Sequence, residues 1–514
     1  MALNRSILPG FSPRDVAAGV SVAVVLVPQS MAYAELAGLP AHYGLYAAAL
    51  PPVAAAFFAS SPYLQTGPVA LTSLLTLGAL SVLATPGSQE FIALAALLAL
   101  VVGVVRIVVG LLKEGRISYL MSRPVLQGFT NAAALLIIAS QIPGALGTPP
   151  PAEGVILGAW WSLSHPGGWE AASMILAVVT GGVILGARRI HPLVPGVLFA
   201  AVIGIAFSIV TEYGGPTVGT VPAGLPPLPR DLPWSQLPLL VIPGAVIALV
   251  GFAEAASISR TFAALDRRPW DPDREFLSQG AANLAAALSS GFPVGGSFGR
   301  SSLNHISGAR SRWSGAVTGL TVLLFLPVAG ILSPLPRAVL SGIVIAAAGG
   351  LIRVPQLTGM WRLSKPQALV AWATFGLTLL LAPRIDLALV IGILLALGIH
   401  GWREMNLRCD SWLEASTFHI APRGVLWFGS APQLQQSFMR ELAQGHDIQQ
   451  IVLHLGGLGR IDLSGALMLK DFQDEMSAGG IHVSVDDVPY HAQRILRRTL
   501  DWQPPGPPGN VIGT

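Results

Sequence analysis

The stretch "GGSFGRSSLNHISGAR", from Gly295 to Arg310, interrupts a long apolar region of the sequence. Glycine and serine residues surround Arg300, and apolar segments lie on either side. A cation at the centre of a bilayer costs roughly 2.5–3.5 kcal/mol on insertion scales. Residues this small cannot cover the guanidinium group, so we expect Arg300 to have a negative ligand or a carboxylate neighbour.

The composition indicates a membrane protein. The chain has 514 residues, of which 52% are hydrophobic and 11% charged, with a mean hydropathy of +0.63. Soluble domains contain about 25% charged residues. The net charge of +4 is scattered, which gives no nucleic-acid footprint. The single cysteine, Cys409, excludes an intramolecular disulfide framework. No nucleophile–base set or metal-ligand spacing is present, so we expect neither an enzyme nor a cofactor or metal site.

Apolar segments long enough to cross about 30 Å of hydrocarbon recur from residue 14 to residue 402. We predict fourteen spans: 14–36, 42–60, 68–84, 90–112, 124–142, 170–187, 193–210, 236–259, 275–290, 298–308, 313–331, 337–351, 366–382 and 384–402. Arginine and lysine concentrate in the loops after the fourth, sixth, eighth, tenth and twelfth spans, and residues 143–169 contain neither. The positive-inside rule then predicts both termini in the cytoplasm of a bacterial inner membrane. The first span is expected to remain uncleaved.

The composition changes after residue 402. Residues 411–514 hold 17 charged positions in 104. Short β-type runs at 425–430, 451–455 and 481–488 surround a helical pattern at 465–480, which is typical of a small α/β domain. We therefore predict a cytoplasmic segment at 1–13, a transport domain at 14–402, an α/β domain at 411–500 and a disordered Pro/Gly-rich tail at 501–514.

The third and tenth spans share an unusual start. The third begins "QTGPVALTSLL" at Gln65 and the tenth begins "GGSFGRSSLN" at Gly295, so both are short and follow glycine or proline. Paired interrupted segments in two halves of a chain indicate a transporter with inverted repeats, here about 14–210 and 236–402. Helix N-termini carry unpaired N–H groups and a partial positive charge, so two of them facing one another form an anion site. Alternatively, the small residues only permit close helix packing.

These residues resemble the SulP family of anion transporters, whose chains end in a STAS domain. "VPQSMAYAELAGLPAHYGLYAA" resembles the family's first span, "QTGPVAL" its third, "GGSFGRSSLNHISGARSRWSG" its tenth, and "IVLHLGGLGRIDLSGALMLKDF" the STAS core. The resemblance implies an all-α membrane domain of fourteen spans in seven-plus-seven inverted repeats, a cytoplasmic STAS domain and a homodimer. It also implies an anion site formed by the following residues: Gln29, Tyr33, Val69, Ala70, Phe298, Gly299, Arg300 and Ser301. Many relatives have serine where this chain has Gly299, so the site has fewer side-chain donors.

Two intramembrane acids are candidates for proton coupling. Glu254 lies well inside the eighth span, and an intramembrane carboxylate is a functional candidate. Its alternative role is a salt bridge with Arg300. Glu35 ranks lower, because its helix position is about 120° from Gln29. Some family members couple to protons through a carboxylate here and others use sodium.

In the STAS-like region, Asp462 and Ser464 occupy the motif "DLSG", where the serine of bacterial anti-sigma antagonists accepts phosphate. Helix capping is the simpler role for this pair.

The sequence thus predicts a secondary transporter of sulfate, bicarbonate or dicarboxylates with proton symport. A nucleobase permease and an anion channel or exchanger without proton coupling are the alternatives.

Overall fold

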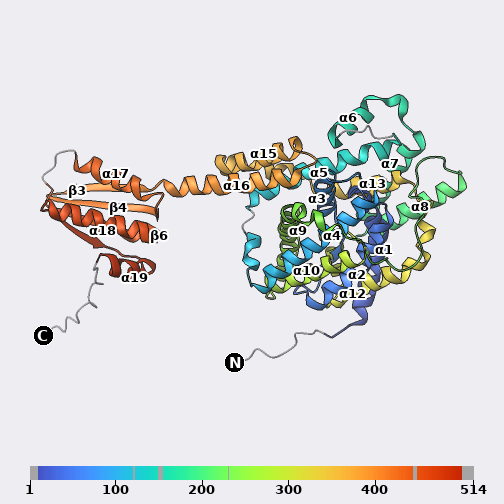
Figure 1. The fold of residues 1–514 in the computed structure, drawn as a ribbon, viewed down its shortest axis with the longest axis horizontal. Coiled ribbons are helices and arrows are strands. Elements are labelled where there is room, and N and C mark those ends of the chain that lie inside the picture. The colour runs from blue at the N-terminus through green and yellow to red at the C-terminus, as the bar shows by residue number, and fades with distance from the viewer. Residues whose placement is uncertain (1–9, 120–121, 149–153, 230, 444–447, 501–514) are drawn as a thin grey trace. The chain divides into compact units, whose positions relative to one another are not determined.

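The structure is a computed structural model that describes residues 10–119, 122–148, 154–229, 231–443 and 448–500. The chain divides into two compact units, residues 1–394 and 395–514 (Figure 1). The predicted tail at 501–514 and most of the segment at 1–13 lie outside the described residues.

Every predicted span contains a helix. These helices are α1 (Pro13–Leu36), α2 (His42–Phe58), α3 (Ala70–Leu80), α4 (Gln89–Leu111), α5 (Arg123–Leu146), α7 (Ala171–Ile190), α8 (Gly196–Val210), α9 (Leu237–Asp266), α10 (Pro272–Leu288), α11 (Phe298–Ile306), α12 (Trp313–Phe325), α13 (Arg337–Gly349), α15 (Lys365–Leu380) and α16 (Ile385–Met405). Two short helices, α6 (Val155–Ser164) and α14 (Val354–Leu363), were not expected. The described residues also contain five 3₁₀ segments: η1 (Gly115–Tyr119), η2 (Pro166–Gly168), η3 (Trp234–Gln236), η4 (Leu326–Leu332) and η5 (Leu455–Gly457). Among the described residues, eight helical segments are both long and apolar enough to cross a membrane.

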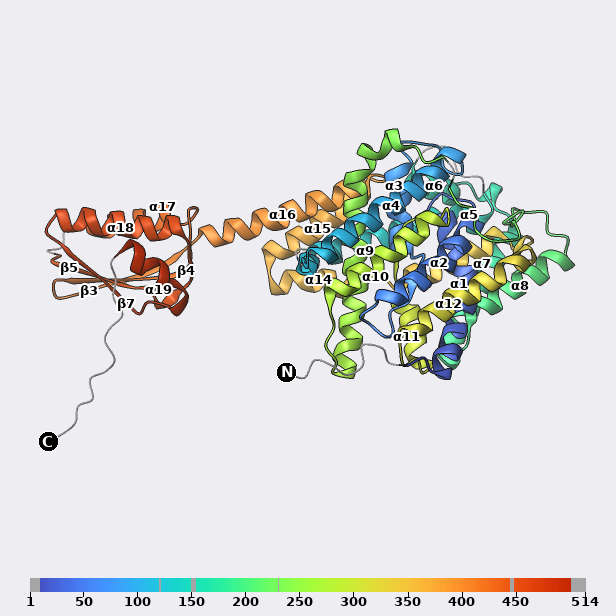
Figure 2. The ribbon, with the colours of Figure 1, turned by 60° about the horizontal axis from the view of Figure 1, so that its bottom comes forward.

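The helix contacts repeat between the two halves of the membrane unit. Helix α4 packs on α9 and α10, and its counterpart α12 packs on α1 and α2 (Figure 2). Likewise, α5 packs on α13 and α15, while α13 packs on α5 and α7. Exchanging the first seven spans with the last seven converts each set of contacts into the other. This symmetry is what inverted repeats require.

The same contacts separate two groups of helices. Helices α1–α4 and α9–α12 pack mainly on one another, and we call them the core group. Helices α5, α7, α8, α13 and α15 form the gate group, and Gly392 of α16 lies against Thr374 of α15. Each half of the sequence therefore contributes the same positions to each group.

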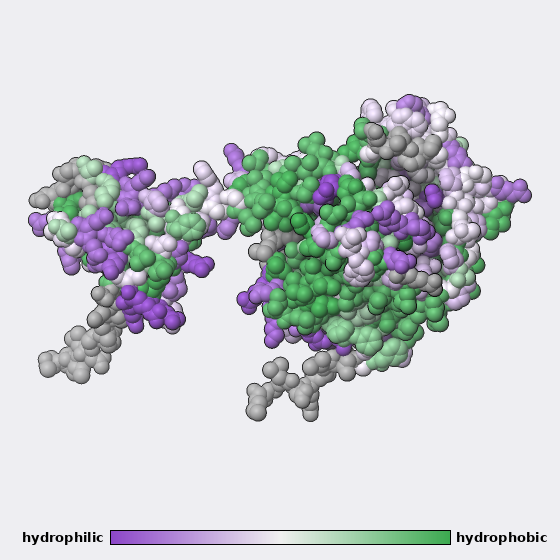
Figure 3. Space-filling model, viewed as in Figure 1, coloured by the Kyte–Doolittle hydropathy of each residue, from purple (hydrophilic) through white to green (hydrophobic). Residues whose placement is uncertain are grey.

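Apolar side chains cover the outside of the membrane unit. Val210, Leu324 and Leu380 are each at least 79% exposed. Figure 3 shows hydrophobic side chains over much of the visible face of this unit and mainly hydrophilic ones on the C-terminal unit. Large exposed apolar areas are rare on soluble proteins, so this surface is suited to lipid.

The C-terminal unit is a five-stranded sheet with helices. Its elements are β3 (Arg408–Glu414), β4 (Thr417–Leu426), β5 (Gln450–His454), β6 (Leu458–Ile461), β7 (His482–Asp486), α17 (Ala431–Leu442), α18 (Leu463–Ala478) and α19 (Tyr490–Thr499). The strand order is β3-β4-β5-β7, with β6 also paired to β4 and only β3 antiparallel. The strand predicted at 425–430 is wrong in position: β4 ends at Leu426, and Trp427 donates its N–H to Ser430 Oγ in the following turn.

Candidate functional site

Two short strands bring the interrupted spans together. Strand β1 (Thr66–Gly67) pairs antiparallel with β2 (Gly295–Gly296), and Thr66 lies opposite Gly296. The N–H of Ser297 donates to the carbonyl of Gln65 at 3.0 Å. Because α3 begins at Ala70 and α11 begins at Phe298, this pairing places the N-terminal ends of the two helices next to one another.

Helix α10 holds both strands in place. Gln279 Nε2 donates to Thr66 Oγ1 at 2.8 Å, beside β1. Asn283 Nδ2 donates to the carbonyl of Val294 at 3.1 Å, and its Oδ1 accepts the Val294 N–H at 3.0 Å, beside β2. Ser301 Oγ accepts the N–H of Gln65 at 2.9 Å. The Ser301 hydroxyl therefore fixes the chain before β1.

The helix ends retain free donors. Val69 caps α3 without a side-chain acceptor, and Val69 and Ala70 are both buried. Within the described part of the chain, the N–H groups of Ala70, Phe298 and Gly299 have no acceptor. Unpaired N–H groups at helix starts are the donors that bind anions elsewhere.

The glycines before and within α11 play different parts. A Cβ on Gly296 would lie 2.8 Å from Leu64 Cδ1 and 3.1 Å from Ala255 Cβ, so close packing explains this glycine. A Cβ on Gly299 would meet nothing within 4 Å. Phe298 is 51% exposed. Close packing therefore explains the glycine in the strand, whereas Phe298 and Gly299 at the start of α11 face open space.

Arg300 begins a directed chain of hydrogen bonds. Its Nη1 donates to Gln29 Oε1 at 3.2 Å, and Gln29 Nε2 lies 3.0 Å from Tyr33 Oη. Arginine can only donate, so the Gln29 oxygen faces it and the Gln29 amide nitrogen donates to Tyr33. Tyr33 accepts this bond and keeps its own O–H free to donate. Gln29 and Tyr33 share a face of α1, as predicted.

The guanidinium group has unused donors. Arg300 is only 2% exposed, yet Nε and Nη2 have no hydrogen-bond partner among the described residues. Nη2 lies 3.5 Å from the point where a Cβ on Gly67 would sit, and Gly67 has φ +152°. Glycine at this position of β1 therefore lets the cation approach the strand.

The two acids occupy different environments. Glu254 is half-buried on α9 and interacts electrostatically with Arg300, but among the described residues the two form no ion pair within 4.0 Å. Glu35 pairs with Arg337, with its Oε1 3.3 Å from Nε. That salt bridge joins α1 of the core group to α13 of the gate group. Of the two acids, Glu254 is the one beside Arg300.

Sequence reasoning missed a second buried arginine. Arg106 on α4 is fully buried and donates to three carbonyls: Ala248, Ile247 and Val294. The first two lie on α9 and the third precedes β2, so Arg106 ties the strand to the helix that carries Glu254. A lone arginine inside the apolar run 90–112 is the signal that would have identified it.

Two further groups anchor the site from its edges. The buried Asp15 carboxylate accepts hydrogen bonds from the N–H groups of Arg310 and Ser311 and from the Ser311 hydroxyl, which ties α1 to the chain after α11.

Tyr63, which lies between α2 and β1, donates its hydroxyl hydrogen to Asp266 Oδ2 at 2.6 Å. Burial, together with this bond to a carboxylate, raises the pKa of Tyr63 to about 12. The Tyr63 hydroxyl therefore remains a donor at neutral pH.

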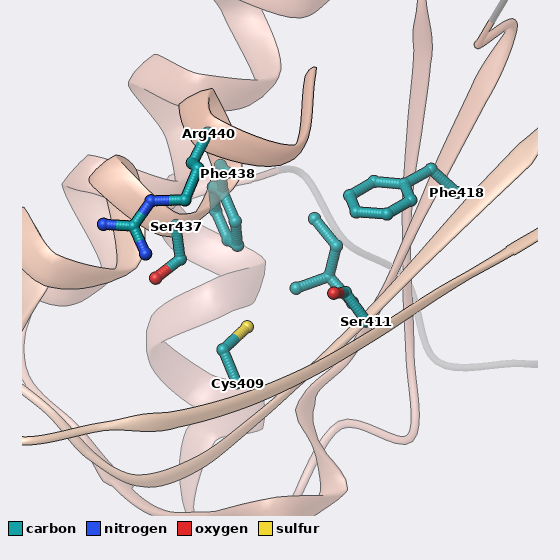
Figure 4. Close-up of a pocket in the computed structure, with 7 residues that line it drawn as sticks. Cys409, Ser411, Phe418, Ser437, Phe438 and Arg440 are labelled. Atoms are coloured by element: carbon teal, nitrogen blue, oxygen red, sulfur yellow. The ribbon is translucent and has the colours of Figure 1, made fainter. Parts of the chain in front are cut away.

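In the C-terminal unit, Asp462 caps α18 by accepting the N–H of Gly465 at 2.7 Å. Ser464 is exposed in the first turn of that helix. Another feature of this unit is a cavity of about 140 Å³ lined by Cys409, Phe418, Phe438 and Arg440, among others (Figure 4). Phe418, Ile420 and Phe438 share its wall with polar side chains, and Asp462 is not among the residues that line it.

Comparisons with known proteins agree with these features. The sulfate permease family model matches residues 13–374, and the STAS domain model matches residues 415–499. Sulfate transporter 4.1 of Arabidopsis thaliana is 33% identical over 426 residues, which cover 80% of this chain and 60% of that protein. A probable sulfate transporter of Mycobacterium tuberculosis is 33% identical over 370 residues, covering 70% and 65%. The matches thus span less than two thirds of either relative.

Solved structures share the fold. The murine Solute Carrier 26 family member A9 anion transporter in the inward-facing state has a TM-score of 0.87 at 19% identity, covering 95% of this chain and 88% of that chain. The transmembrane domain of the cyanobacterial bicarbonate transporter BicA has a TM-score of 0.65 at 24% identity, covering 75% and 97%. The predicted architecture of a helical membrane domain followed by a STAS domain is confirmed.

Proposed function

The chain belongs to the sulfate permease family and carries a STAS domain, and from this premise we propose that it is a secondary transporter of small anions. The family is one of permeases, in agreement with the expectation that the chain is not an enzyme. Transport proceeds by alternating access, in which the core group moves against the gate group. The Glu35–Arg337 salt bridge between the groups breaks and reforms in that cycle.

One observation carries the proposal: the β1–β2 pair joins two helix N-termini beside a buried arginine that has donors to spare. The anion accepts hydrogen bonds from the N–H groups at the starts of α3 and α11, from Arg300 Nε and Nη2, and from the Tyr33 hydroxyl. Val69 and Ala70 supply the wall on the α3 side, and Phe298 and Gly299 supply it on the α11 side. Ser301 acts by holding Gln65.

Coupling to protons follows from competition for one cation. Ionised Glu254 and a bound anion both lower their energy by interacting with Arg300, and they repel one another. A proton on Glu254 leaves the whole charge of Arg300 to the anion, so proton and anion bind cooperatively. We propose proton symport with Glu254 as the carrier and Glu35 as the less favoured acid.

The donors in the site suit an oxyanion, because the oxygens of sulfate point in several directions and can accept from N–H groups that approach from different sides. Sulfate is the anion to test first, since the Arabidopsis and mycobacterial relatives are named sulfate transporters. The lysine and arginine distribution supports an inner-membrane protein with both termini in the cytoplasm. Assembly as a homodimer rests on the family resemblance.

The test is uptake by proteoliposomes that contain the full chain. Labelled sulfate, bicarbonate, fumarate and uracil are supplied with and without an inward proton gradient. The proposal expects saturable uptake of at least one anion, accelerated by the gradient. Uptake of uracil alone would favour the nucleobase permease. Anion flux that neither saturates nor accumulates against a gradient would favour a channel.

A further inference from the structure

We propose that the STAS domain binds a divalent transition-metal ion, with Zn²⁺ as the preferred ion, through His454, Asp486 and Asp487. These residues lie at the carboxyl ends of β5 and β7. The site is separate from the anion site and from Asp462. It goes against the expectation of no metal site, which rested on ligand spacing along the chain.

The sheet register assembles the ligands. Strands β5 and β7 are parallel neighbours, and His454 lies opposite Asp486. Asp487 follows directly, with φ +51°, and its N–H donates to Asp486 Oδ1 at 2.9 Å. The carboxyl edge of a parallel sheet is where α/β proteins commonly bind ligands. Residues far apart in sequence therefore meet where a ligand is normally held.

The ligand atoms have the spacing that a metal ion needs. One nitrogen of His454 and one carboxylate oxygen from each aspartate all lie within 4.8 Å of one another. His454 Nδ1 is 3.8 Å from Asp486 Oδ2, too far for a direct hydrogen bond. In a tetrahedral zinc site with bonds of about 2.1 Å, neighbouring ligand atoms lie about 3.4 Å apart. An ion between these groups requires only a small inward movement of two exposed carboxylates.

A hydrogen bond with His419 orients the imidazole of His454. His454 Nε2 lies 3.0 Å from His419 Nδ1. Metal binding at Nδ1 of His454 requires the proton on Nε2, and His419 is placed to accept it. Metal-ligating histidines usually donate their second N–H in this way. The opposite nitrogen of His419 lies 3.8 Å from Glu414 Oε2, which places a negative charge near this ring without a direct hydrogen bond.

An aromatic side chain fixes both rings. Trp412 on β3 stacks on His419 with ring centroids 5.1 Å apart and on His454 at 5.4 Å. His419 and His454 lie edge to edge, with ring centroids 5.3 Å apart and 18° between their planes, as their hydrogen bond requires. The imidazole ligand is therefore held in one orientation before any ion binds, which lowers the entropy cost of binding.

The donor set selects the class of ion. One imidazole with two carboxylates suits Zn²⁺ and its neighbours in the first transition row, whereas Mg²⁺ and Ca²⁺ prefer oxygen ligands alone. Three protein ligands leave a coordination position for water or for a group from a partner.

The test uses the full chain in detergent, purified without a polyhistidine tag. Co²⁺ is titrated as a spectroscopic substitute for Zn²⁺. We expect a visible absorption band that saturates at about one equivalent and disappears on adding Zn²⁺. Absence of both the band and any calorimetric signal for Zn²⁺ overturns the proposal. So does displacement of Co²⁺ by an equal concentration of Mg²⁺, which would indicate an acidic cluster alone.

Variants assign the ligands. His454→Gln should abolish the band, and His419→Gln should weaken Co²⁺ binding about 10- to 100-fold. His482→Gln is the matched control, because His482 is an exposed residue at the far end of β7 and should leave binding unchanged. Should His454→Gln aggregate, the Asp486→Asn/Asp487→Asn double variant replaces it, since both side chains are exposed. Wild-type affinity in either ligand variant refutes the assignment.

Discussion

Replacing Arg300 with glutamine tests the anion site most directly. The change removes the buried charge and the two guanidinium nitrogens that have no protein partner, Nε and Nη2. A hydrogen bond to a charged group contributes about 1.5–3 kcal/mol. Taking that range for the pair together, because neighbouring contacts are not additive, the anion dissociation constant should rise about 10- to 150-fold.

The same substitution should not destabilise the protein in the absence of anion. Burying a cation in the membrane costs roughly 2.5–3.5 kcal/mol on insertion scales, and glutamine avoids that cost. The single bond that is lost goes to Gln29 Oε1. Arg300→Gln should therefore unfold at the wild-type temperature or above it without anion, and gain less stability than wild type when anion is added.

The assay is thermal unfolding of the detergent-solubilised chain, titrated with the anion that the uptake panel identifies. Arg300→Lys keeps the charge but loses the planar fork of donors, so its affinity should fall between wild type and Arg300→Gln. Arg310→Gln is the control for net charge, because its side chain is exposed in the chain after α11. An unchanged dissociation constant for Arg300→Gln would refute the reasoning, as would an equal loss in Arg310→Gln.

Three other changes have defined outcomes. Glu254→Gln should remove the acceleration of uptake by an inward proton gradient while anion exchange continues, because a neutral amide neither competes for Arg300 nor carries a proton. Unaltered gradient dependence in proteoliposomes would exclude Glu254 as the carrier. Gly299→Ser should fold normally, since a Cβ there meets nothing within 4 Å, and its added hydroxyl should alter the ratio of sulfate to bicarbonate uptake. A lower unfolding temperature would show that the start of α11 has no room for a side chain at this position. Asp462→Ala should lower the free energy of unfolding of the STAS domain by about 1 kcal/mol, because it removes the cap of α18, and should lower its unfolding temperature by about 4–8 °C. Asp462→Asn should retain most of the stability. Equal losses in both variants would mean that capping is not the role of Asp462.

The starts of α3 and α11 could be located from the sequence because their causes are local. Glycine and proline next to small polar residues end one secondary-structure element and begin another, whatever the tertiary packing around them. The pairing of Gln29 with Tyr33 followed from helical spacing for the same reason. Helix α14, which begins with a proline at its second position, was missed because its apolar content is too low for a span.

The contacts that hold the site could not be predicted in this way. Thr66 meets Gln279, and Val294 meets Asn283, only because two strands and a helix from different parts of the chain pack together. The role of Ser301 also depends on this packing. Its residue type suggests a donor to a ligand, and its position next to β1 also makes it an acceptor for the N–H of Gln65. The metal ligands at His454 and Asp486 come from two strands and leave no pattern in the sequence.

Arg106 and Arg300, the two buried arginines among the described residues of the core group, differ in how many of their nitrogens have hydrogen-bond partners. All three nitrogens of the Arg106 guanidinium donate to backbone carbonyls, so each of them has a partner within the protein. Only one of the three nitrogens of Arg300 has a partner among the described residues. A buried donor without a partner costs about 1–3 kcal/mol, and more when it is charged. Such a cost within a well-packed unit is best explained by a ligand that supplies the missing acceptors for part of the transport cycle.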